Sequence, residues 1–197
     1  MHGANRLGGN GVANSTVFGG IAGDTMAAWL ARDGAWREPD PTALDAAIAR
    51  GEAPFRGHRG DVDALEAIRE RLFAVMWDDA GIVRNAAGLE RADRALGELE
   101  TELEATSAVG GDRRAFNLTW HDWLNLASLI DVAQVIVRAA QRRENSRGAH
   151  FRDDFPDAGA LETSAYTRIR RSADGALAAE HVPVRFTRVR PGESLIA

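Results

Sequence analysis

Apolar side chains recur at steps of three and four residues along the middle of the chain, which is the spacing of one face of an α-helix. The first such stripe follows Asp61, a good N-cap residue, and ends before Gly81. The second stripe runs from about Ala87 to Ala105 and carries many charges on its other faces. Both segments are therefore predicted as amphipathic helices. Their apolar positions are Val62, Leu65, Ile68, Leu72, Val75 and Met76, then Leu89, Leu96, Leu99 and Leu103.

A third helix is predicted from about Thr119 to Glu144. Its start, Thr119-x-x-Asp122, is typical of a capping box. The segment is apolar over most of its circumference, so we expect it to be the most buried of the three helices. Glycines at 81, 110 and 111 leave only short connections, and three helices joined in this way predict an antiparallel bundle.

The N-terminal part of the chain has a different composition from the bundle. Residues 11–32 are small and helix-permissive, and Asp33-Gly34 is a C-terminal stop signal. Prolines at 39 and 41 then mark a linker, within which we expect a short helix over residues 42–50.

Beyond Gly148 the pattern becomes that of a β-hairpin. Residues 165–170 and 182–189 alternate in polarity or carry β-branched side chains, and Asp174-Gly175 between them is a turn signal. Pro183 either confines its strand to a sheet edge or marks the start of that strand.

These elements predict a mainly α fold in four parts. Residues 1–34 form a glycine loop and helix, residues 35–60 a linker, residues 61–156 an antiparallel three-helix bundle, and residues 157–197 a small C-terminal β-hairpin. At 197 residues, with 45% hydrophobic and 27% charged side chains, the chain has the composition of a globular protein with one good core.

Composition also narrows the possible functions. A formal net charge of −5 gives no basic footprint for nucleic acid. The absence of cysteine excludes disulfides, thiolate nucleophiles and iron–sulfur ligation by this chain. The most apolar stretch, residues 118–137, is interrupted by charged and polar side chains, so we expect no direct membrane insertion. No signal-peptide pattern is visible, which makes the cytoplasm the expected location.

The densest chemical signal lies between His2 and Asn10. Glycines at 3, 8 and 9 permit tight turns and a close approach of the backbone to a ligand. Arg6 offers a planar fork of donors that suits a carboxylate or a phosphate. A helix that follows such a loop presents free N-terminal amides, which attract an anion or an electron-rich ring.

The residues from His2 to Asn10, continued by Val17-Phe18-Gly19 and Ala22-Gly23, resemble the flavin- and substrate-binding segment of the succinate dehydrogenase and fumarate reductase flavoprotein family. A second stretch, residues 143–156 (RENSRGAHFRDDFP), resembles the family segment that leaves the last bundle helix. Together the matched segments cover about residues 1–156, and residues 1–34 then correspond to the tail of the family's FAD-binding domain.

This resemblance implies FAD as cofactor and a C4 dicarboxylate such as succinate or fumarate as substrate. Arg6 matches the arginine that holds a substrate carboxylate. Gly11 and Val12 match the residues whose backbone amides contact the pyrimidine end of the flavin. The family often has serine at the position of Gly11, and glycine removes that hydroxyl while keeping the amide. We assign no catalytic role to any residue of this chain, including His2.

His150 with Asp153 and Asp154 has the residue types of a metal site, but the two acids are adjacent and their side chains need not converge. Arg147 and Arg152 offer local ion pairs instead. We therefore expect a packed, charge-paired loop and no metal.

The chain contains no G-x-G-x-x-G fingerprint after a strand, so no site for the dinucleotide pyrophosphate is visible. In the resembled family this fingerprint and the proton-donating arginine lie upstream. We accordingly expect a fragment of a longer flavoprotein, rather than a split subunit, that passes a hydride between a C4 dicarboxylate and flavin N5 and is inactive as an isolated chain.

The expected partners are the remainder of the flavoprotein and an iron–sulfur subunit, through which the protein would lie at the inner face of the membrane. Two alternatives stay open. One is an L-aspartate oxidase-like fragment, although that group tends toward Ala-Ser-Asn where this chain has Gly8-Gly9-Asn10. The other is a non-catalytic helical interaction module, in which Arg6 would be dispensable.

Overall fold

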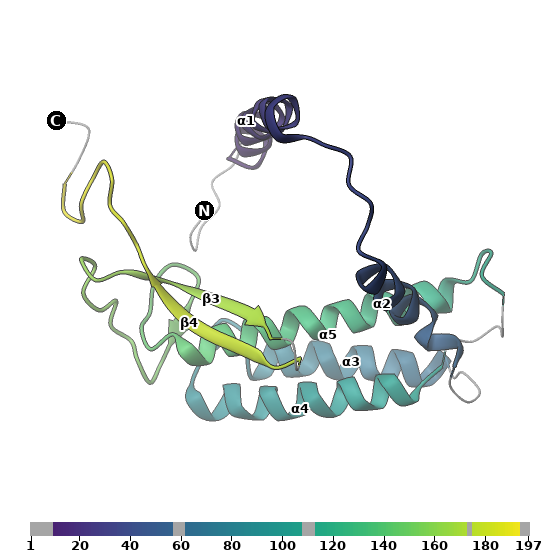
Figure 1. Ribbon diagram of the computed structural model, residues 1–197. Coiled ribbons are helices and arrows are strands. Elements are labelled where there is room, and N and C mark those ends of the chain that lie inside the picture. Colours follow the sequence, from purple (N-terminus) through teal and green to yellow (C-terminus); the bar gives the residue numbers. More distant parts are fainter. Residues whose placement is uncertain (1–9, 57–61, 108–112, 173–174, 194–197) are drawn as a thin grey trace. The chain divides into compact units, whose positions relative to one another are not determined.

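Helices dominate the chain, as the hydrophobic pattern predicts (Figure 1). The computed structural model describes residues 10–56, 62–107, 113–172 and 175–193, and the chain divides into two units, Met1–Arg50 and Gly51–Ala197. The helices are α1 (Asn10–Asp33), α2 (Pro41–Glu52), a 3₁₀ turn (Ala53–Phe55), α3 (Val62–Asp78), α4 (Ala86–Ala105) and α5 (Leu118–Arg142). The strands are β1 (Val83–Arg84), β2 (Phe151–Arg152), β3 (Ala165–Arg171) and β4 (Leu177–Pro183).

The first unit contains α1, whose end confirms the predicted stop signal. The Gly34 N–H donates to the Leu30 carbonyl at 3.1 Å. A Cβ at Gly34 would lie only 2.5 Å from that carbonyl oxygen, so a larger residue could not follow this path without a shift. The short helix expected in the linker is α2, which begins at Pro41 where the missing N–H costs nothing.

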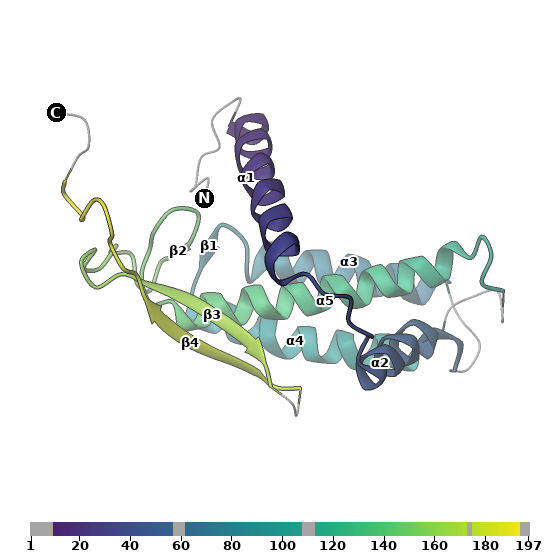
Figure 2. The ribbon, with the colours of Figure 1, turned by 45° about the horizontal axis from the view of Figure 1, so that its top comes forward.

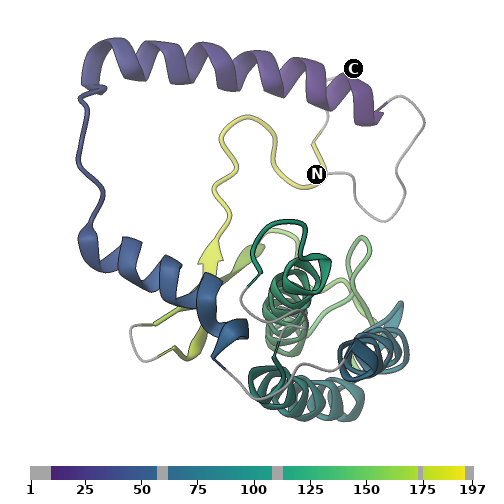
Figure 3. The ribbon, with the colours of Figure 1, turned by 90° about the vertical axis from the view of Figure 1, so that its right-hand side faces the viewer.

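The second unit is built on the predicted bundle of α3, α4 and α5. The three helices lie side by side in Figure 2, and Figure 3 shows them nearly end-on around a common core. Polar contacts join neighbouring helices, since Arg71 on α3 pairs with Glu102 on α4 at 2.6 Å and Trp123 on α5 donates to the Leu103 carbonyl of α4. The predicted stripes supply the core, whose largest buried members are Leu65, Ile68, Leu72, Leu89, Leu96, Leu99, Leu103, Trp123, Leu126, Ile130 and Val137.

Two details of α5 differ from the prediction. The predicted capping box at Thr119 is wrong, because Asn117 is the N-cap and its side-chain oxygen accepts from the Trp120 N–H at 3.0 Å. The Thr119 hydroxyl instead donates to the same Asn117 oxygen at 2.8 Å. At its other end α5 stops at Arg142, two residues before Glu144, and Arg143 is the C-cap.

The helix α5 is also less enclosed than expected. It buries six residues and so does the shorter α4, so the expectation that α5 is the most buried helix is wrong. A second apolar stripe, with Leu129, Val132 and Ile136 at 44%, 56% and 39% exposure, faces outward. Among the described helices α5 alone is long and apolar enough to cross a membrane by length and composition, a test that a core helix of a bundle also passes.

The predicted hairpin is present, with its second strand displaced. Strand β4 runs from Leu177 to Pro183 and pairs antiparallel with β3, so Pro183 ends the strand opposite Ala165. The predicted strand over residues 182–189 is therefore wrong. The cause is a tight turn, in which Gly175 has a positive φ of 87° and the Ser172 N–H donates to the Ala176 carbonyl at 2.9 Å. Because the turn is short, the pairing between the two strands resumes directly after it, with Leu177 opposite Arg171.

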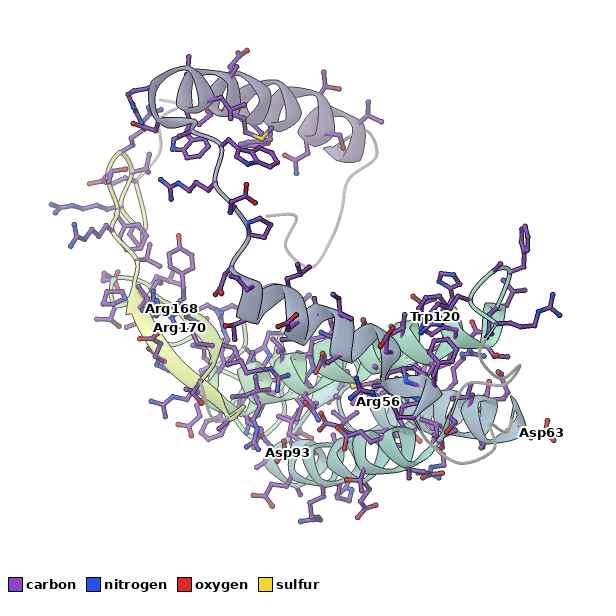
Figure 4. The ribbon with its side chains drawn as sticks, turned by 45° about the vertical axis from the view of Figure 1, so that its right-hand side comes forward. Arg56, Asp63, Asp93, Trp120, Arg168 and Arg170 are labelled. Carbon is purple, nitrogen blue, oxygen red and sulfur yellow. The ribbon has the colours of Figure 1, made fainter. Side chains whose placement is uncertain are left out.

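The hairpin rests on the bundle through α5. Arg171 at the end of β3 pairs with Asp131 of α5 at 2.9 Å. Arg168 and Arg170, both labelled in Figure 4, project from β3, and Arg168 pairs with Glu180 on β4 at 2.6 Å. The hairpin is thus tied both across its strands and to the long helix.

Candidate functional site

The structure describes the predicted flavin and substrate segment only from residue 10 onward, at the start of α1. Arg6, like the rest of the chain before residue 10, lies outside the described residues. Gly11 and Val12 lie in the first turn of α1, where backbone N–H groups have no acceptor within the helix. The hydroxyls of Ser15 and Thr16 donate to the carbonyls of these two residues at 2.9 Å. The N–H groups of a first turn point out of the N-terminal end because of the helix geometry itself. Such an end favours a negatively charged group.

The second resembled segment forms a polar cluster beyond the C-terminal end of α5. The chain leaving α5 returns to the α3–α4 connection, where β2 pairs in parallel with β1 and Arg152 lies opposite Arg84 (Figure 2). The Asp153 N–H adds a bond to the Arg84 carbonyl at 2.9 Å. Neither short strand was expected from the sequence. The pairing anchors the loop to the bundle across a long sequence separation.

Arg152 is the centre of this cluster, because its side chain is only 2% exposed. It makes a bidentate contact with Asp154, from Nε to Oδ1 at 2.7 Å and from the second guanidinium nitrogen to Oδ2 at 2.6 Å. Its remaining nitrogen donates to the carbonyls of Ala140 and Gln141 at the end of α5. The guanidinium also lies 4.9 Å from the centre of the Phe155 ring. Arg152 therefore joins the helix end to the loop.

The ionisation of Asp154 reflects these contacts. The hydrogen bonds from Arg152 lower the pKa of this carboxyl from 3.8 to about 2, and the Ala86 N–H, which donates to Oδ2 at 2.9 Å, acts in the same direction. The Arg152 pKa is raised by the same pair. Because Ala86 begins α4, the carboxylate also places a negative charge at a helix N-terminus.

His150 is held between two partners that fix its tautomer. An Arg84 guanidinium nitrogen lies 3.1 Å from Nδ1, and arginine can only donate, so Nδ1 accepts. Nε2 lies 3.0 Å from the Arg143 carbonyl oxygen and must donate to it. Burial, followed by the charges of Arg84, Arg143 and Arg152, lowers the His150 pKa. The ring is thus neutral with both nitrogens engaged, which leaves no free lone pair for general base work.

The expected charge-paired loop is confirmed for Arg152 and Asp154 and is wrong for Arg147. Arg147 bonds to backbone carbonyls and to the Ser164 hydroxyl at 2.8 Å, and pairs with no carboxylate among the described residues. Asp153 accepts a weak bond from Asn85 at 3.4 Å. Within the described ranges, no three His, Asp or Glu side chains converge to hold a metal.

Sequence reasoning missed the contribution of the α3–α4 connection. Arg84 donates from Nε to the carbonyls of Ala80 and Gly81 at 3.0 and 2.8 Å, and burial lowers its pKa. The side chain of Asn85 caps α4 by accepting from the Gly88 N–H at 2.9 Å. An asparagine directly before a helical pattern was the available signal for the cap, whereas nothing local indicates that Arg84 meets His150.

The architecture is thus an antiparallel helical bundle that carries a polar return loop and a hairpin. Residues 69–195 match the family described as Fumarate reductase flavoprotein C-term, and the chain belongs to this family. Over 198 aligned positions it is 35% identical to a Mycobacterium tuberculosis protein named fumarate reductase flavoprotein subunit. That match covers 98% of this chain and 34% of the relative, so the chain spans about a third of the relative's length.

Two solved structures superpose on nearly the whole of this chain. A chain of the Mycobacterium smegmatis Sdh1 complex with UQ1 superposes with a TM-score of 0.79 at 30% identity, over 97% of this chain and 32% of that one. A chain of a quinol-fumarate reductase with menaquinol molecules superposes with a TM-score of 0.82 at 26% identity, over 95% and 33%.

Proposed function

We propose that this chain is the C-terminal part of an FAD-dependent oxidoreductase of the succinate dehydrogenase and fumarate reductase type. The observation that carries the proposal is the match to a fumarate reductase flavoprotein subunit along nearly the whole chain. The complete protein would transfer a hydride between a C4 dicarboxylate and flavin N5, and the flavin supplies the redox chemistry when bound. The relative is named as a subunit, which supports a partnership with further polypeptides. An iron–sulfur subunit is the partner that we propose.

Arg6 is the residue of this chain that we assign to the substrate. A guanidinium can bind a carboxylate through two parallel hydrogen bonds, which fixes the plane of the substrate relative to the flavin. This is a positioning role, because arginine stays protonated throughout the accessible pH range. The absence of other basic residues between His2 and Asn10 makes Arg6 the natural anion clamp of the segment.

The start of α1 is assigned to the flavin. Reduction places negative charge near the pyrimidine end of the ring, and the N–H groups of Gly11 and Val12 occupy the helix end that stabilises such charge. Glycine at position 11 adds no side chain between the helix end and a flat ligand. The site so formed is one wall only, since no dinucleotide fingerprint is present in the sequence.

A chimera tests this function. The chain would replace the matching C-terminal third of the Mycobacterium tuberculosis fumarate reductase flavoprotein subunit, and turnover of fumarate, succinate and aspartate would be measured. We expect activity with the C4 dicarboxylates and a loss of about 10–100-fold in kcat/KM for Arg6→Ala, the value of one charge-assisted contact. Arg37→Ala, which removes an exposed arginine, should leave kcat/KM unchanged.

Different failures have different meanings. A chimera that folds with FAD but turns over only aspartate would favour the aspartate oxidase alternative. Full activity of Arg6→Ala would show that this arginine does not bind the substrate, as the interaction-module alternative requires. The isolated 197-residue chain should not bind FAD at micromolar concentration, and flavin fluorescence titration that detects such binding would overturn the one-wall interpretation.

A further inference from the structure

A small cavity lies beside the polar cluster, between the loop that leaves α5 (residues 143–164) and the hairpin. Its volume is about 180 Å³, below the ~300–1,000 Å³ of typical cofactor and drug-sized pockets, so it suits a small ligand. Its lining includes Arg143, Glu144, Arg147 and Thr163, together with Thr167 and His181 of the hairpin. All of these residues belong to the second unit.

Two arginines give the cavity its charge. Arg143 donates from Nε to the Asn145 side chain at 3.0 Å, and neither Arg143 nor Arg147 forms a salt bridge within the described part of the chain. Burial, followed by the nearby charge of Arg147, lowers the Arg143 pKa. Two like charges held near each other repel, and a bound anion relieves that repulsion.

Arg147 is held in place before any ligand binds. Its Nε donates to the Ala158 carbonyl, and its terminal nitrogens donate to the Ala160 carbonyl at 3.0 Å and to the Ser164 hydroxyl at 2.8 Å. Gly159 passes this guanidinium with a positive φ of 69°, a conformation that glycine adopts without strain. A donor that is already fixed loses little conformational entropy on binding, which raises the affinity for a small ligand that makes few contacts.

The remaining wall adds hydroxyls and little opposing charge. Thr167 on β3 lies directly opposite His181 on β4, and both line the cavity. The carbonyls of Ala140 and Gln141 near the end of α5, which would oppose an anion, already accept hydrogen bonds from Arg152. Glu144 is the one carboxylate in the lining, so the two arginines and this glutamate together carry a charge of +1.

We propose that this cavity binds a small oxyanion, a phosphate or a short monocarboxylate, between Arg143 and Arg147. This proposal does not rest on the role assigned to Arg6 or on flavin. Arg143 supplies the guanidinium with free terminal donors, Arg147 the preset one, and the threonine hydroxyls the neutral contacts.

Backbone amide NMR of the full 197-residue chain tests the proposal. Inorganic phosphate and acetate are titrated separately at constant ionic strength, with chloride as the reference anion, while the amides of Ser164, Ala165 and Arg147 are followed. We expect saturable shifts at these amides with one of the two oxyanions, and the comparison identifies which. Shifts that are absent, or that chloride reproduces, would overturn the proposal.

Matched variants separate a built site from diffuse charge. Arg143→Gln should weaken binding at least about tenfold, whereas Arg142→Gln, the same charge change one residue outside the cavity, should leave it within about twofold. Glu144→Gln should strengthen binding about twofold or more, because it removes the one opposing charge. Equal weakening by the Arg142 and Arg143 changes would reduce the effect to general electrostatics and refute the site.

The design remains decisive if one variant is unstable. Should Arg143→Gln fail to fold, the sign of the Glu144→Gln effect still decides, since weaker or unchanged binding contradicts an anion between these side chains. Arg6→Ala should leave the shifts at Ser164 and Ala165 unchanged. Failure of the dicarboxylate assay and failure of this cavity are therefore independent results.

Discussion

Replacing Asp154 with asparagine removes the charge that balances the buried Arg152, and we expect it to lower the free energy of unfolding by about 2–4 kcal/mol. The lowered pKa of Asp154, from 3.8 to about 2, corresponds to roughly 2 kcal/mol of preference for the carboxylate. Its side chain is 29% exposed, so solvent screening reduces this contribution somewhat.

The upper end of the range comes from Arg152. Its side chain is 2% exposed, and removing one partner of a buried ion pair costs about 3–5 kcal/mol because the other charge stays buried. Asparagine keeps an oxygen acceptor at the site, and the carbonyls of Ala140 and Gln141 remain bonded to the guanidinium. Because of these contacts, we expect the loss in unfolding free energy to be smaller than the full cost of leaving a buried charge unpaired.

Urea unfolding at neutral pH, followed by tryptophan fluorescence, measures this loss. The buried Trp123 reports on the bundle core. Asp153→Asn is the matched control, because that neighbouring carboxylate accepts a weak bond from Asn85 at 3.4 Å and acts on Arg152 through charge alone. Its effect should stay within about 0.5 kcal/mol. A loss below about 1 kcal/mol for Asp154→Asn, or equal losses for both variants, would refute the view that Arg152 depends on Asp154.

The pH dependence of the same pair has a defined sign. The folded-state pKa of Asp154 lies below the unfolded value, so the unfolded chain takes up the proton first as the pH falls. The stabilisation is complete above about pH 5 and is lost as the pH falls from about 4 to about 2. The stability difference between the unmodified chain and Asp154→Asn should therefore shrink over that interval, and a difference that grows would contradict the pairing.

Two further predictions concern the ends of α5. His150 has a lowered pKa, so its contribution to stability is complete above pH 6.5 and is lost as the pH falls below that value. An NMR titration of its ring should give a midpoint below 6.5 and the Nε2–H tautomer at neutral pH. A midpoint above 6.5 would contradict the Arg84 contact. Asn117→Ala should cost about 1 kcal/mol in urea unfolding through loss of the cap, whereas Asn117→Asp should recover most of it; equal stability of the two variants would argue against capping.

The helices could be predicted because their apolar stripes are long and regular. The predicted helix from Ala87 to Ala105 differs from α4 by one residue at its start. The start of a helix is harder to predict where two possible N-cap residues lie close together, as Asn117 and Thr119 do before α5. Either side chain could accept from a free backbone N–H of the first turn, and in the structure Asn117 accepts from Trp120. Local sequence does not decide between them.

The hairpin shows how pairing overrides propensity. The β-branched residues after His181 have high strand propensity, which led the prediction to place the second strand over residues 182–189. The actual strand β4 contains alanines at 178 and 179, which have low propensity. The tight turn at Gly175 brings these residues opposite β3, and the cross-strand hydrogen bonds then determine the strand.

The polar cluster could be anticipated only in part. The short-range pair of Arg152 and Asp154 lies two residues apart and was within reach of sequence reasoning. Arg84 and His150 are 66 residues apart, and only the fold brings them together. The segment that carries Arg6 resembles a family pattern, and the relative that this chain matches is about three times as long, so this chain alone does not contain the residues that would complete the proposed site.

The polar cluster contributes to geometry more than to net stability. A buried ion pair gains little over an apolar core of the same volume, although breaking it is costly, so its presence is poorly explained by stability alone. Arg152 binds carbonyls at the end of α5, while Arg147 binds those of the loop that leads to the hairpin. Directional bonds of this kind permit one path for the chain between helix and hairpin, whereas apolar packing would permit several. We infer that the cluster fixes this path, and with it the two arginines that face the cavity.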